Sequence, residues 1–234
     1  MIQLRKSEVV ADRQDIERFK IEFQQKQCVL LPKLLEPRLL DFLLDRLERG
    51  LWRNKIHGGI GVELILEDAP ARGLLHFVAN APAFLKTVKE ITGCGPLTQF
   101  GGRVYRFIPN AGHYDSWHND DGNGRLVAMS LNLSPQGYEG GVFQLRDWSS
   151  KRILVEIANT GWGDATLFRI SAKLDHRVTE VTGEKSKTAF AGWFNSGGPN
   201  PFTGLGSFDQ LRTAQPEEWS PAQHVLSGRH DQQT

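Results

Sequence analysis

The segment HYDSWHNDDGNG, residues 113–124, concentrates side chains that can bind a metal ion, since it holds two histidines and three aspartates. A calcium loop needs an acidic residue at its first position, glycine at the sixth and glutamate at the twelfth. With Gly122 at the sixth position, Trp117 would be first and Ala128 twelfth, which excludes a calcium loop. The chain also lacks the His-Glu-x-x-His pattern of zinc proteases.

Within this segment, His118 and Asp120 are the pair best suited to share one ion. Residues two apart on a strand point to the same face, so an imidazole nitrogen and a carboxylate oxygen can meet there. The same parity turns Asp115 and Asp121 away from His118, and Asp121 suits the turn DGNG. His113 is expected at the surface. A His-x-Asp pair is also common beside polar turns, so a metal site requires a third ligand from elsewhere.

The candidate third ligand is His176, in the segment LDHRVTEV. Two histidines and one carboxylate hold Fe(II) on one face and leave the opposite coordination positions open. With these residues the chain resembles the Fe(II)/2-oxoglutarate-dependent dioxygenases, in particular their prolyl 4-hydroxylase-like branch. The resemblance rests on His118-x-Asp120, on His176-x-Val178, and on Lys187 with Trp193 six residues later; it covers roughly residues 96–194.

The resemblance implies that His118, Asp120 and His176 bind Fe(II) and that 2-oxoglutarate chelates the iron, with its far carboxylate on a buried cation. Lys187 suits this place because the strand KTAFAGWF puts Lys187, Ala189, Ala191 and Trp193 on one face, and the alanines leave room for a slim dicarboxylate. Lys185 has the same parity and is the alternative cation.

Asn132 and Tyr105 are the further expected contacts with 2-oxoglutarate. Asn132 stands where related hydroxylases have a tyrosine, and it shares the polar face of the strand RLVAMSLNLS with Ser130. Both residues would equally suit a polar place in the core or in a hairpin. No catalytic residue is expected beyond the metal site.

The reaction that the resemblance implies is hydroxylation of a substrate, coupled to conversion of 2-oxoglutarate and O2 into succinate and CO2. Asp120 favours hydroxylation, because related halogenases lack this carboxylate. The sequence does not identify the substrate; the resemblance allows a prolyl residue of a protein or peptide or, alternatively, a small-molecule metabolite. A non-catalytic jelly-roll protein that binds or senses a metal is the remaining alternative, but a structural metal site needs no buried cation such as Lys187.

The elements that position these residues divide the chain into regions. Residues 1–95 read as mostly helical support, from apolar residues at helical spacing in DIERFKIEFQQ, PRLLDFLLDRLERG and APAFLKTVKEITG, the last capped by Asn80. Residues 96–194 hold seven short β-like runs without intervening helices, which favours a barrel or jelly roll. We expect one α+β domain over 1–234 with a mainly β core, the cupin-like double-stranded β-helix of the family, N-terminal helices packed on it, and a Gly/Pro-rich segment over 195–234.

Composition excludes several other classes of function. The net charge of +1 gives no sign of the excess positive charge that binds nucleic acid. No apolar run approaches the ~18 residues of a membrane span. The N-terminal residues lack the apolar core of a signal peptide. Cys28 and Cys94 are too few for a disulfide framework. We therefore expect a cytoplasmic protein whose partner is its protein, peptide or small-molecule substrate.

Overall fold

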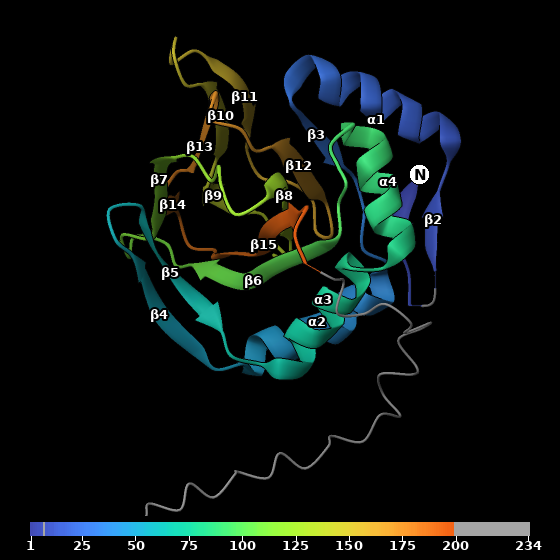
Figure 1. Ribbon diagram of the computed structural model, residues 1–234. Coiled ribbons are helices and arrows are strands. Elements are labelled where there is room, and N and C mark those ends of the chain that lie inside the picture. Colours follow the sequence, from blue (N-terminus) through green and yellow to red (C-terminus); the bar gives the residue numbers. More distant parts are fainter. Residues whose placement is uncertain (7, 199–234) are drawn as a thin grey trace, which may run out of the picture.

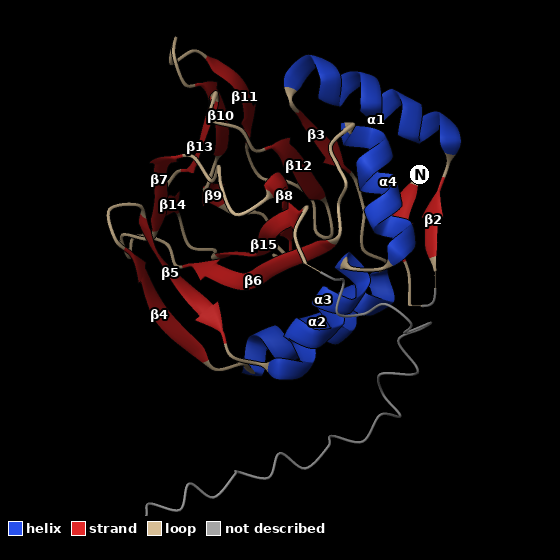
Figure 2. Cartoon of the chain, viewed as in Figure 1, coloured by secondary structure: helices blue, strands red, loops and turns tan. Residues whose placement is uncertain are grey.

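The computed structural model describes residues 1–6 and 8–198, and in this range four helices cover one side of a strongly curved β-sheet (Figures 1 and 2). The helices are α1 (Arg13–Lys26), α2 (Pro37–Arg49), α3 (Ala69–Ala79) and α4 (Pro82–Thr92). Each turns an apolar stripe inward; α2, for example, buries Leu39, Leu40, Leu43 and Leu47. None of these described helices is both long enough and apolar enough to cross a lipid bilayer.

The helices α1, α2 and α4 confirm the predicted ones, whereas α3 was not predicted. Asn80 does not cap α4, because the N-cap position is Ala81. The Asn80 side chain instead joins α3 to the sheet: its amide nitrogen donates to the His76 and Phe100 carbonyls, and its oxygen accepts from the Phe100 N–H. A fully buried side-chain amide is retained here because it satisfies backbone groups that would otherwise lack partners.

The main sheet follows one path of antiparallel neighbours, β11-β10-β13-β7-β5-β6-β15-β8-β12-β3, with β4 added to β5. It curls into the nearly closed jelly roll that the sequence predicts (Figure 1). Its strands are β3 (Cys28–Leu31), β4 (Trp52–His57), β5 (Gly61–Leu66), β6 (Gln99–Phe107), β7 (Tyr114–His118), β8 (Arg125–Asn132), β10 (Phe143–Asp147), β11 (Ile153–Ile157), β12 (Ala165–Arg169), β13 (Leu174–Val178) and β15 (Lys187–Asn195). Two small sheets pair β1 (Ile2–Leu4) with β2 (Val9–Ala11), and β9 (Glu139–Gly140) with β14 (Val181–Thr182).

Alternation along β15 separates two apolar regions. Phe190 and Phe194 point toward the helices, where they pack with Phe100 at ring-centroid distances of 5.2 and 4.7 Å. Ala189 and Trp193 point into the jelly roll, beside a second apolar cluster that includes Tyr105. Because side chains alternate along β15, one face of the strand packs against the helices and the other face lines the inside of the jelly roll.

The N-terminal part of the chain also contributes strands to the jelly roll. Residues 1–95 were expected to be mostly helical, but residues 52–66 of this region form the β4–β5 hairpin. Strand β4 escaped prediction because it is largely exposed on both faces and therefore shows no alternation of apolar residues. The Gly/Pro-rich residues beyond 198, with His224 and His230, lie outside the described residues.

Candidate metal and 2-oxoglutarate site

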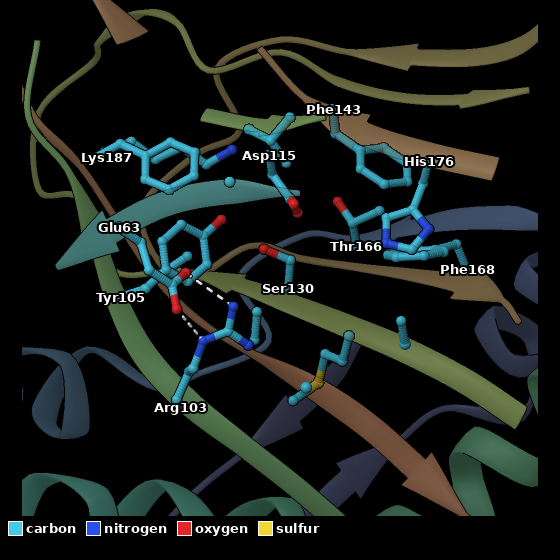
Figure 3. A pocket seen from close by; sticks show the side chains of 18 of the residues that line it. Glu63, Arg103, Tyr105, Asp115, Ser130, Phe143, Thr166, Phe168, His176 and Lys187 are labelled. Atoms are coloured by element: carbon cyan, nitrogen blue, oxygen red, sulfur yellow. Dashed lines mark hydrogen bonds and ion pairs between the residues drawn. The ribbon is translucent and has the colours of Figure 1, made fainter. Parts of the chain in front are cut away.

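A cavity of about 300 Å³ opens inside the jelly roll. Its walls come from β5, β6, β7, β8, β13 and β15, so residues far apart in the sequence meet there (Figure 3). All six predicted site residues line it: Tyr105, His118, Asp120, Asn132, His176 and Lys187.

The three predicted metal ligands meet at one end of this cavity. His118 on β7 and His176 on β13 are cross-strand partners, with ring centroids 4.2 Å apart. Asp120 Oδ2 lies 3.7 Å from His118 Nε2 and 3.4 Å from His176 Nε2. Two imidazole nitrogens and one carboxylate oxygen are therefore gathered in the combination that suits Fe(II).

Asp120 reaches this point for a reason other than strand parity. Strand β7 ends at His118, so Asp120 belongs to the loop that follows. Its carboxylate is held by side chains from two other strands: Trp193 Nε1 donates to Oδ2 at 2.7 Å, and Arg125 donates to Oδ1 at 3.0 Å.

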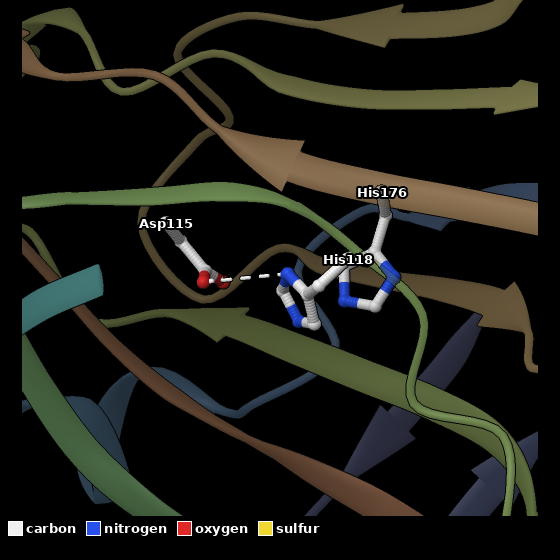
Figure 4. Close-up of side chains that lie close together, drawn as sticks. All are labelled: Asp115, His118 and His176. Atoms are coloured by element: carbon white, nitrogen blue, oxygen red, sulfur yellow. Dashed lines mark ion pairs between the residues drawn. The ribbon is translucent and has the colours of Figure 1, made fainter. Parts of the chain in front are cut away.

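Asp115 lies on the same side as the histidines, contrary to the parity expectation. Its Oδ1 is 3.5 Å from His118 Nδ1, and Asp115, His118 and His176 form a cluster with ligand atoms within 4.8 Å of one another (Figure 4). The reason is a bulge: His176 pairs with His118, but Val178 pairs with Asp115, so β7 has one extra residue between these pairs. An extra residue in one strand reverses the face of everything beyond it.

The tautomer of His118 distinguishes the two carboxylates. His118 Nδ1 lies 2.7 Å from the Ser116 carbonyl oxygen, which can only accept, so Nδ1 carries a proton. The nitrogen available for a metal is then Nε2, and that atom faces Asp120, whereas Asp115 approaches Nδ1. This arrangement favours Asp120 over Asp115 as the partner of the histidines.

The charges at this end of the cavity favour a cation. Burial disfavours the imidazolium of His118, but the Asp120 and Asp115 carboxylates outweigh burial and raise its pKa to about 9. Burial acts against the charge of Asp120 too, yet both histidines together hold the pKa of this carboxyl far below its usual value. Burial lowers the pKa of His176, which leaves its imidazole neutral. A metal ion would take the place of the His118 proton.

Lys187 lies toward the other end of the cavity, with its side chain 6% exposed (Figure 3). Its ammonium donates to the Gly141 carbonyl at 2.7 Å, and no carboxylate in the described part of the chain lies within ion-pair distance. Burial lowers its pKa to about 8, although the charge of Asp115 partly offsets this. Gly141 leaves room for the lysine stem, because a Cβ there would lie 3.0 Å from Lys187 Cδ.

The remaining predicted contacts differ in what they can offer. Lys185 is exposed and does not line the cavity. Tyr105 is buried, its hydroxyl points into the cavity, and burial raises its pKa (Figure 3). Asn132 already uses its amide nitrogen to donate to the Thr160 and Gly161 carbonyls. Its donors therefore hold the loop beside the cavity, and its predicted contact with 2-oxoglutarate stays a prediction.

Several polar residues of the cavity were missed by sequence reasoning. Glu63 on β5 is buried and binds the Arg103 guanidinium through both carboxylate oxygens (Figure 3). His57 Nε2 lies 2.8 Å from Glu63 Oε1. No local motif marks these residues, because they come from different strands and meet only in the folded sheet. His113, expected at the surface, is 5% exposed, and its Nδ1 accepts from the Ile108 N–H.

Comparison with known proteins gives a match to one family. Residues 102–195 match the sequence model described as the 2OG-Fe(II) oxygenase superfamily, and this range includes all six predicted site residues. No curated protein sequence matches the chain.

Solved structures share the fold at low sequence identity. A Pseudomonas putida prolyl-4-hydroxylase is 17% identical, with a TM-score of 0.59, over 78% of this chain and 100% of its own. A Trichoplax adhaerens prolyl hydroxylase, solved with a hypoxia inducible factor peptide fragment, is 14% identical, with a TM-score of 0.61, over 80% and 94%. The epimerase SnoN, solved with Fe3+, alpha ketoglutarate and nogalamycin RO, is 12% identical, with a TM-score of 0.57, over 79% and 85%. With the match over residues 102–195 and this shared fold, the chain is similar to the iron- and 2-oxoglutarate-dependent dioxygenases of the 2OG-Fe(II) oxygenase superfamily.

Proposed function

We propose that His118, Asp120 and His176 hold Fe(II), that Lys187 binds the far carboxylate of 2-oxoglutarate, and that the enzyme hydroxylates a substrate in the same cavity. The main support for this proposal is that the Lys187 ammonium is buried and has no carboxylate partner among the described residues. A buried charge is costly unless it is paired, so it marks the place of an anionic ligand.

The protein's part in this chemistry is to orient and to enclose. The Ser116 carbonyl fixes the tautomer of His118, and the contacts from Trp193 and Arg125 fix Asp120. When bound, the iron and 2-oxoglutarate supply the activation of O2, which no side chain can provide. Phe143 and Phe168 lie against His176, at ring-centroid distances of 6.4 and 4.8 Å, and shield it from water.

The substrate side of the cavity is formed by the β4–β5 hairpin and its neighbours. Ile60 and Tyr114 are partly exposed there and offer an apolar rim, and the Arg103–Glu63 pair forms a polar wall. Because His57 and Arg103 already occupy the Glu63 carboxylate, this wall presents mainly donors from Arg103. Such a wall suits carbonyl groups, as a peptide backbone presents them.

We therefore propose a prolyl residue in a peptide or protein as the substrate, in line with the peptide held by the Trichoplax prolyl hydroxylase. A small molecule is the second candidate, because SnoN of the same fold was solved with nogalamycin RO.

The experiment is succinate release from 2-oxoglutarate, measured with a library of proline-containing peptides and, separately, with a pool of metabolites. His176→Ala supplies the background without bound iron. Stimulation by peptides supports the proposal, and stimulation by metabolites alone replaces it with the second candidate. The absence of any succinate above the His176→Ala background would refute oxygenase activity at this site.

A further inference from the structure

Arg125, at the start of β8, contacts both Asp120 and Trp193. Its guanidinium donates to Asp120 Oδ1 at 3.0 Å and lies over the Trp193 ring, with its central carbon 3.8 Å from the ring centroid. Trp193 in turn donates from Nε1 to Asp120 Oδ2 at 2.7 Å. The three side chains thus form a closed set of contacts at the wall of the cavity.

This set fixes the rotation of the Asp120 carboxylate. Each of its oxygens accepts from a different donor, so a turn of the carboxylate would break both hydrogen bonds. Oδ2 is the oxygen that faces the Nε2 atoms of His118 and His176, while Oδ1 is held by Arg125. Because Asp120 follows the end of β7, no strand ladder orients its backbone, and side chains must supply the orientation.

Arg125 is itself held in place. A guanidinium stacked on an aromatic face has lost its freedom to swing toward solvent. Its side chain is 27% exposed, and Asp120 is its sole ion-pair partner among the described residues. These features separate it from the exposed ion pairs of the helices, such as Arg49 with Asp45, where side-chain exposures are 80% and 58%.

We propose that Arg125, seated on Trp193, is a positioning residue that presents Asp120 Oδ2 to the metal and keeps Oδ1 away from it. The proposal rests on the assignment of Asp120 as a metal ligand under the proposed function. Residues that orient a metal ligand typically change metal affinity about 10- to 100-fold when they are removed.

The test is the affinity for Co(II), titrated alone and without 2-oxoglutarate, so that the result does not depend on turnover. Arg125→Met keeps an apolar stem over Trp193 but removes the donors, and it should weaken Co(II) binding about 10- to 100-fold. Arg125→Lys, which retains a charge and a donor, should recover part of the loss. Trp193→Phe keeps a ring but removes Nε1–H, and it provides a second variant with the same expected direction.

A double-mutant cycle distinguishes positioning from a general structural role. If Arg125 acts through Asp120, Arg125→Met should cause no further loss of Co(II) affinity in an Asp120→Ala background. The matched control is Arg106→Met, because Arg106 also stacks on a tryptophan, Trp52 at 4.0 Å, but does not line the cavity. This control should bind Co(II) like the wild type.

The outcomes separate the two proposals. Wild-type affinity in Arg125→Met, together with weak binding by Asp120→Ala, would overturn the role of Arg125 and leave the ligand assignment intact. A loss from Arg125→Met that is as large without Asp120 as with it would also overturn this role. Wild-type affinity in Asp120→Ala would overturn the ligand assignment, and the role of Arg125 with it.

Discussion

Replacement of Lys187 by methionine should stabilise the protein while it weakens 2-oxoglutarate binding. Burial lowers the pKa of Lys187 from 10.5 to about 8, and each pKa unit corresponds to about 1.36 kcal/mol. The buried charge therefore costs the folded protein about 3 kcal/mol near neutral pH. Methionine has a similar length and no charge, but it leaves the Gly141 carbonyl without its donor, at a cost of about 1–2 kcal/mol.

The net expectation is a gain of about 1–2 kcal/mol in the free energy of unfolding, or roughly 2–8 °C in Tm for a chain of this size. Because the folded pKa lies below the unfolded one, the penalty is full below about pH 8 and is lost as the pH rises toward 10.5. The stability difference between Lys187→Met and wild type should therefore shrink across this pH window. Thermal and urea unfolding at several pH values measure it.

The same substitution should weaken binding of 2-oxoglutarate to the metal-loaded protein about 30-fold or more, since a buried charge partner is worth about 2 kcal/mol or more. Lys185→Met is the matched control, because Lys185 is exposed and should affect neither quantity. Destabilisation of the protein by Lys187→Met at neutral pH, or binding of 2-oxoglutarate to this variant as tightly as to wild type, would contradict the role of Lys187 as a buried, unpaired cation that binds 2-oxoglutarate.

Three further perturbations test other parts of the site. The affinity of the wild type for 2-oxoglutarate should fall as the pH rises above about 8, where Lys187 loses its proton. In calorimetric titrations, Lys187→Arg should abolish this fall. The same pH profile in Lys187→Arg and in the wild type would argue against Lys187 as the partner of the anion. Asp120→Asn should lower Fe(II) affinity far more than Asp115→Asn does, and the reverse order would make Asp115 the ligand. Glu63→Gln should lower the free energy of unfolding, measured in urea, by about 1–3 kcal/mol. This is less than the loss of a fully buried ion pair would cost, because the Arg103 side chain is 33% exposed. An unchanged free energy of unfolding would mean that the Glu63–Arg103 pair is dispensable for stability.

Much of the site could be predicted from sequence because strand parity operates locally. The face of β15 that carries Lys187, Ala189, Ala191 and Trp193 lines the cavity as predicted. On β8, the face opposite Ser130 and Asn132 carries Val127, Met129 and Leu131, and these residues pack in the apolar core on the helix side of the sheet. In regular strands, period-two alternation is enough to sort residues between interior and core.

Parity failed where the strand is irregular. The extra residue in β7 turns Asp115 toward His118, where regular alternation would turn it away. Asp120 does lie beside His118, as alternation predicts, but β7 ends before it, so the strand does not hold it there. A bulge depends on pairing with β13, which no local pattern reveals. Burial, which separates Lys187 from the exposed Lys185, is likewise a property of the assembled sheet.

The polar wall of the cavity was also beyond sequence reasoning. Glu63 and Arg103 meet because β5 and β6 are neighbours in the sheet, and β5 lies in the region 1–95, which was expected to be mostly helical. Asn132 was recognised as facing inward, but its hydrogen bonds to the 160–161 carbonyls depend on a loop far along the chain. Non-local contacts of this kind follow from topology and not from spacing.

The most direct test of iron and 2-oxoglutarate binding at this site is an anaerobic titration with Fe(II) followed by 2-oxoglutarate, monitored by visible absorption. Chelation of ferrous iron by 2-oxoglutarate should produce the weak charge-transfer band expected for this family. This band should appear in the wild type, disappear in His176→Ala, and appear only at much higher 2-oxoglutarate concentrations in Lys187→Met. A band that persists unchanged in His176→Ala, or no band in the wild type, would contradict the assignment of this site.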